Sequence, residues 1–60
     1  MTLADALLEI DTVVQGWRAD EIAALRAKEP DRAHECAVRI AALEYLREQI
    51  VTKTLQSRSA

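Results

Sequence analysis

The chain of 60 residues has one glycine, one proline, one cysteine and no phenylalanine, and its aromatic residues are one tryptophan and one tyrosine. A single cysteine excludes an intrachain disulfide, and a lone cysteine fits a reducing, cytoplasmic compartment. No apolar run approaches the roughly 18 residues that a membrane-spanning helix needs. Residues 1–10 carry two acids and no base, so we expect no signal peptide and no membrane association.

The chain is rich in alanine, leucine, glutamate and arginine, a composition typical of helical bundles and coiled coils. The net charge of -2 argues against a protein whose main role is to grip nucleic acid. A chain this short forms one domain at most and buries only about 60% of its unfolded surface. Such small scaffolds commonly need a disulfide, a metal or oligomerisation.

Pro30 stands at the midpoint of the chain, between two stretches of helix-forming residues. A residue before proline is disfavoured in the α region, so the first helix should end just before it, and a short connection makes the two helices antiparallel. We predict an all-α fold, a two-helix antiparallel hairpin in a single domain. Its expected parts are a helix at 3–28, a turn at 29–31, a helix at 32–55 and a frayed tail at 56–60.

The first predicted helix has a start signal and one weak point. Thr2 and Asp5 have the spacing of a capping box. Gly16 lies inside the helix, where glycine costs about 1 kcal/mol relative to alanine. We expect the helix to continue through Gly16 rather than break there.

Each predicted helix carries an apolar row with the alternating three- and four-residue spacing of a coiled-coil seam. Folding about residue 30 sets position i level with a residue near 60 minus i, which matches apolar with apolar and predicts that Asp11 meets Arg47 and Glu21 meets Arg39. One hairpin leaves an apolar side exposed, so we expect a homodimer, a four-helix bundle. Its core and dimer interface should comprise Leu7, Ile10, Val14, Trp17, Ile40, Leu43 and Ile50.

The second helix carries another apolar row on its opposite side, in which Val38, Ala41 and Tyr45 are the main members. This row has two interpretations. Either the helix rotates so that both rows are partly buried within the dimer, or the second row binds another protein.

No pattern indicates catalysis, a cofactor or a metal. His34 and Cys36 are metal-ligand types, but helical neighbours at i and i+2 do not share a face. Asp31 and His34 have the i, i+3 spacing of di-iron bundles, yet they lie at a helix end with no matching glutamate opposite. Cys36 lacks the base and the oxyanion site that a nucleophile needs. We expect no enzyme activity, no cofactor and no metal.

Binding is therefore the predicted role: a small adaptor, assembly factor or inhibitor of a larger protein, of the kind that bacterial or phage accessory genes encode. The alternative is a dimeric nucleic-acid-binding regulator, either an RNA-binding hairpin or a helix-turn-helix-like arrangement with a break at Gly16. Acidic Asp31 and Glu35 at the start of the would-be recognition helix disfavour the latter. The basic positions of the second half are spread around the helix: Arg32, Arg39, Lys53 and Arg58.

Overall fold

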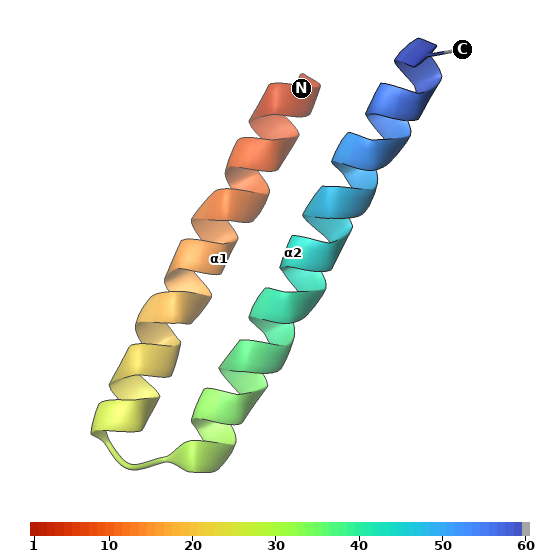
Figure 1. The fold of residues 1–60 in the computed structure, drawn as a ribbon. Coiled ribbons are helices and arrows are strands. Elements are labelled where there is room, and N and C mark those ends of the chain that lie inside the picture. Colours follow the sequence, from red (N-terminus) through yellow and green to blue (C-terminus); the bar gives the residue numbers. More distant parts are fainter. Residues whose placement is uncertain (60) are drawn as a thin grey trace.

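The fold consists of two long helices joined by a short loop (Figure 1). In the computed structural model, helix α1 spans Leu3–Arg26 and helix α2 spans Pro30–Ser59. The structure describes residues 1–59, with side chains for residues 1–58. The helices run antiparallel side by side, with both termini at one end and the loop at the other (Figure 1). The predicted all-α hairpin is confirmed, while the dimer stays a prediction.

The start of α1 has the capping box that the sequence predicts. The Thr2 hydroxyl oxygen accepts a hydrogen bond from the backbone N–H of Asp5 at 3.1 Å, and the Asp5 carboxylate accepts one from the N–H of Thr2 at 3.2 Å. Two backbone donors that a helix start would leave unpaired are thereby satisfied.

Helix α1 passes through Gly16 without a break, as predicted. A Cβ built on Gly16 meets no atom within 4 Å, so packing inside the hairpin does not require glycine here. The conformational cost of a mid-helix glycine is therefore not offset by any contact within a single chain.

The loop begins two residues earlier than predicted, because α1 ends at Arg26 rather than at residue 28. Lys28 adopts a left-handed conformation with φ of 58°. Its N–H donates to the Leu25 carbonyl at 3.2 Å, and the N–H of Glu29 donates to the Ala24 carbonyl at 2.9 Å. These two bonds are those of a Schellman motif, which satisfies the last carbonyls of a helix and reverses the chain.

Helix α2 begins at Pro30 rather than at residue 32, so the turn predicted at 29–31 lies two residues earlier, at 27–29, with the same length. A proline suits the first helical position because its φ is already fixed near the helical value and its missing N–H would have no partner there. Asp31 follows in the first turn, where a negative charge complements the helix dipole.

Helix α2 also continues beyond the predicted end at residue 55. The tail at 56–60, predicted to fray, is helical through Ser59, and Ala60 lies outside the described residues. The tail contains no glycine or proline to end the helix, and Arg58 places a positive charge in the last turn.

The buried core follows the line of contact between the two helices and is small. Among the residues whose side chains the structure describes, it consists of Val14, Ala24, Ala33, Cys36 and Ile40 and contains no polar or charged residue. The hairpin measures 49 × 18 × 11 Å along its principal axes, so the shortest dimension is about that of one helix. Within the described part of the chain, no helix combines the length and the apolar character needed to span a membrane.

Candidate functional site

The residues predicted for the core and dimer interface are all at least half-buried in the single chain. Val14 and Ile40 are 6% and 7% exposed. The intermediate ones are Leu7, Ile10, Trp17, Leu43 and Ile50. The predicted set omitted three of the five buried residues, Ala24, Ala33 and Cys36, which are 0%, 6% and 2% exposed. Spacing was the available signal on the second helix, since Ala33 and Cys36 precede Ile40 by seven and four residues on the same row, but small side chains add little hydrophobicity.

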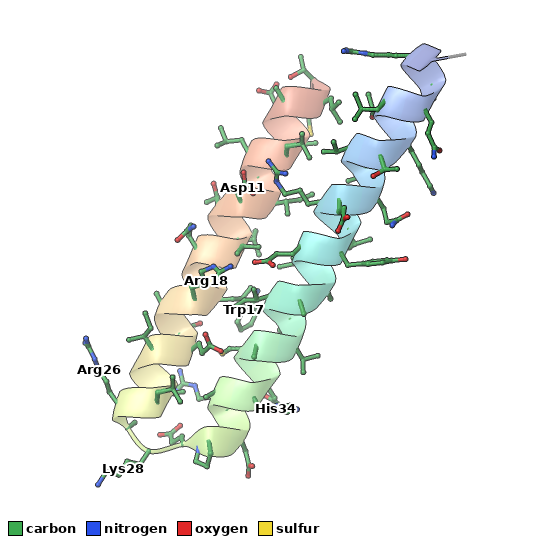
Figure 2. All side chains as sticks on the ribbon, viewed as in Figure 1. Asp11, Trp17, Arg18, Arg26, Lys28 and His34 are labelled. Carbon is green, nitrogen blue, oxygen red and sulfur yellow. The ribbon has the colours of Figure 1, made fainter. Side chains whose placement is uncertain are left out.

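One side of the hairpin is tied by ion pairs between the helices, which we call the ion-pair side. Arg47 Nε donates to Asp11 Oδ1 at 2.9 Å, which confirms the predicted pairing and the register. Arg18 and Glu44 form a second pair between α1 and α2. Asp11 and Arg18 are seven residues apart, so they lie on the same side of α1, and both reach toward α2 in Figure 2.

The other side of the hairpin has a cation–π contact instead. Trp17 lies between the helices (Figure 2), and the Arg39 guanidinium lies over its ring at 4.7 Å from the centroid. Arg39 also pairs with Glu35 at 3.8 Å along α2. The predicted pair between Glu21 and Arg39 does not form, because the Arg39 guanidinium contacts the tryptophan ring and Glu35 instead.

The second apolar row of α2 is exposed, and we call Val38, Ala41 and Tyr45 the outer row. Val38 is 54% exposed and Tyr45 is 62% exposed. Their spacing of three and four residues places them along one side of α2. Residues that contact α1, such as Ile40 and Leu43, alternate with them in sequence, so the outer row is turned away from α1.

A further exposed apolar area joins the two helices on the side of Trp17 and Arg39. Val13 precedes Trp17 by four residues on α1, and Leu46 follows Arg39 by seven on α2, so both lie on this side. Val13 is 48% and Leu46 is 53% exposed. Gly16 and Ala42 are small residues that lie within one turn of Val13 and Leu46. We call the area formed by Val13, Gly16, Ala42 and Leu46 the Val13–Leu46 face.

Sequence reasoning did not identify the Val13–Leu46 face, because Val13 and Leu46 belong to different helices and to neither of the predicted sets of residues. The side on which Arg39 meets Trp17 shows that Val13 and Leu46 adjoin. Val13 and Leu46 lie at nearly the same height along the hairpin, because their residue numbers add to about the same total as those of the paired Asp11 and Arg47.

The surface of the described residues offers faces for binding rather than a cavity. No pocket opens in it. In the same residues, no group of three or more His, Cys, Asp or Glu side chains is placed to hold a metal ion. Cys36 is a free thiol that is 2% exposed, and His34 is exposed on α2. These two side chains therefore have different environments and do not form one site.

Comparison of the chain with protein-family models, with curated proteins and with solved structures found no match.

Proposed function

We propose that the protein is a non-enzymatic binding module, a self-associating helical hairpin that acts on a larger protein as an adaptor, assembly factor or inhibitor. The observation that carries the proposal is the exposure of the outer row, with Val38 at 54% and Tyr45 at 62%. An aromatic residue beside aliphatic ones at helical spacing is the pattern by which one helix anchors in a groove of a partner.

The extent of the exposed surface supports self-association. A compact monomer of 6.7 kDa exposes about 3,900 Å² by the usual scaling of surface with mass. This chain exposes 4731 Å². The excess of about 800 Å² is close to what each partner buries in a protein interface of standard size. Pairing of two hairpins covers this excess and gives the bundle the second layer that one hairpin lacks.

The distribution of basic side chains favours a protein partner over a nucleic acid. Half of the eight lysines and arginines are paired with carboxylates: Arg18, Arg32, Arg39 and Arg47. The others lie in two groups at opposite ends of the hairpin, with Arg26 and Lys28 by the loop (Figure 2) and Lys53 and Arg58 near the termini. A phosphate backbone needs basic side chains on a continuous track.

The binding role is tested by quantitative capture from the native cell, with the tagged wild type compared with two variants. Tyr45→Ala removes the aromatic anchor of the outer row, and Ile22→Ala removes a side chain of α1 that is 50% exposed. We expect one protein to be retained by the wild type and Ile22→Ala and lost with Tyr45→Ala. Calorimetry with the purified partner then measures the affinity of all three.

Stability measurements accompany this comparison. Tyr45→Ala should change the free energy of unfolding by no more than about 0.5 kcal/mol, because an exposed side chain loses few contacts. Equal capture by the wild type and Tyr45→Ala contradicts the proposed role of the outer row. Recovery of nucleic acid, with affinity that falls steeply as salt is added, supports the alternative regulator instead.

Sedimentation velocity over a range of protein concentrations tests self-association. We expect the mass of a dimer at high concentration. A monomer at every concentration contradicts the dimer and leaves the outer row to be judged by the capture experiment alone.

A further inference from the structure

We infer that the Val13–Leu46 face packs against a second copy of this chain, with both loops at the same end, so that α1 of each copy lies on α2 of the other. The inference rests on the self-association proposed above. It adds which face is covered and how the two hairpins are oriented.

The two sides of the hairpin differ in the charges that a second copy would cover. The ion-pair side has the Arg18–Glu44 and Asp11–Arg47 pairs across it, and all four side chains are about half exposed. A second copy on that side would remove these charges from water. The free energy of desolvation exceeds the attraction that an already formed ion pair gains. The side of the Val13–Leu46 face has one interhelical contact that involves a charge, that of Arg39 with Trp17, so covering it removes fewer charged side chains from water than covering two ion pairs.

Small residues on the Val13–Leu46 face let another helix approach it closely. Gly16 and Ala42 leave the backbone of each helix accessible beside the exposed side chains of Val13 and Leu46. The space around Gly16 is open, with no atom within 4 Å of a Cβ built there. Interaxial distances between packed helices decrease as the side chains at the contact become smaller. No contact inside the hairpin requires a glycine at position 16, whereas in the inferred dimer Gly16 lets the helix of the second copy approach closely.

The edge of the face on α1 is acidic. Glu9 precedes Val13 by four residues, and Asp20 follows it by seven, so both lie on the same side of α1 as Val13. Both are exposed, and within the described residues neither forms an ion pair. The face therefore has an acid above and below its apolar centre on α1.

The charges at the edge of the face on α2 have the opposite sign. Arg39 precedes Leu46 by seven residues and Lys53 follows it by seven, so both lie on its side of α2. Lys53 is exposed and has no ion pair in the described structure, while Arg39 pairs with Glu35 at 3.8 Å. Near the termini the face therefore sets Glu9 on α1 beside Lys53 on α2, and near the loop it sets Asp20 on α1 beside Arg39, whose charge Glu35 on the same side of α2 partly balances.

The register of the hairpin decides between the two symmetric ways of pairing these charges. Glu9 lies near the height of Lys53, and Asp20 near that of Arg39, because level residues have numbers that add to about the same total as Asp11 and Arg47. With the loops at the same end, α1 faces α2 of the second copy at equal heights. Each acid then meets a base, and two-fold symmetry repeats both contacts.

The opposite orientation sets like charges together. With the loops at opposite ends, α1 lies on α1 of the second copy and α2 on α2. If the apolar centres coincide, Glu9 is level with Asp20 of the second copy, and Arg39 is level with Lys53 of the second copy. Like charges placed directly opposite are unfavourable, so the charge pattern selects the arrangement with both loops at one end. The outer row stays uncovered in that arrangement.

A charge-exchange experiment tests the orientation in the full chain. The variants are Glu9→Lys, Lys53→Glu and an equimolar mixture of the two, compared with the wild type by sedimentation equilibrium. In the inferred dimer, each single variant sets like charges together at two symmetric contacts, so the dissociation constant should rise about tenfold. In the mixture, the two substituted side chains meet at one contact and the unsubstituted Glu9 and Lys53 meet at the other. Both contacts then join opposite charges, so a heterodimer should form with nearly the wild-type affinity.

The opposite orientation predicts the reverse result for Glu9→Lys. There the new lysine faces Asp20 of the second copy, so self-association becomes tighter, and this outcome overturns the inference while leaving the dimer in place. A wild type that stays monomeric overturns the inference together with the self-association on which it rests. Added salt should weaken the wild-type dimer, because the contacts lie at an exposed edge.

A second measurement does not depend on charge. Spin labels on Arg26→Cys, in a Cys36→Ala background whose helicity is checked by circular dichroism, report the distance between the two loops. The inferred dimer brings them together, whereas opposite loops are separated by most of the 49 Å length of the hairpin. For the choice of face, Leu46→Glu should dissociate the dimer, and Ile22→Glu, at an equally exposed position four residues after Arg18 on the ion-pair side, should not.

Discussion

Lys28 is a residue whose replacement by glycine should stabilise the hairpin. Its φ of 58° lies in the left-handed region, where the Cβ of an L-residue crowds the following carbonyl oxygen. The Schellman bonds from Lys28 to Leu25 and from Glu29 to Ala24 fix this conformation, because the chain reverses only with that residue left-handed. Glycine adopts the same φ without a steric penalty.

The magnitude follows from two opposing terms. The left-handed conformation costs an L-residue about 1–2 kcal/mol, which glycine avoids. Glycine also gives the unfolded chain more freedom, which offsets about 0.4–1 kcal/mol. The Lys28 ammonium lies near the negative end of the α1 dipole, so its charge must be separated from the backbone effect. Lys28→Ala does this, and we expect Lys28→Gly to be about 0.5–1 kcal/mol more stable than Lys28→Ala.

The assay is thermal and urea unfolding followed by circular dichroism, with all variants at one protein concentration because self-association shifts the midpoint. For a chain of this size the expected gain corresponds to a rise in Tm of about 2–8 °C. Ala27→Gly is the matched control, since Ala27 has φ of -80° and should lose about 0.5–1 kcal/mol. If Lys28→Gly is no more stable than Lys28→Ala, the left-handed turn is not the loop conformation in solution.

Three further predictions concern the two helices. Gly16→Ala should raise the unfolding free energy of the dilute hairpin by about 1 kcal/mol, because a Cβ there meets no atom within 4 Å; a loss of stability in urea unfolding would show a contact within one chain. Trp17→Ala should cost about 2 kcal/mol, below the roughly 3–5 kcal/mol of a fully buried tryptophan, since the ring is only half-buried under Arg39; an unchanged melting curve would remove Trp17 from the helix interface. A double-mutant cycle with Asp11→Ala and Arg47→Ala should give a coupling of about 0.2–1 kcal/mol at low salt, and additive single effects would mean that the 2.9 Å pair does not set the register.

The sequence alone was sufficient for the features that depend on neighbours within a few residues. The capping box of Thr2 and Asp5 is local, since it is decided by hydrogen bonds inside one turn. The spacing of the apolar rows is equally local, and it carried the prediction of an antiparallel hairpin. A short central loop restricts which residues of the two helices lie side by side, and the predicted pairing of Asp11 with Arg47 was therefore correct.

The tertiary structure decided what depends on how far each helix rotates about its axis. In the observed register Arg39 lies near the height of both Glu21 and Trp17, and the rotation of α2 directs it over the ring. The same rotation brings Val13 and Leu46 to one side, although they are remote in sequence. The sequence also did not predict the left-handed conformation of Lys28. The packing of the two helices sets the conformation of the turn, and lysine has no preference for it. Periodicity fixes which residues share a face of one helix, whereas contact between helices fixes which faces meet.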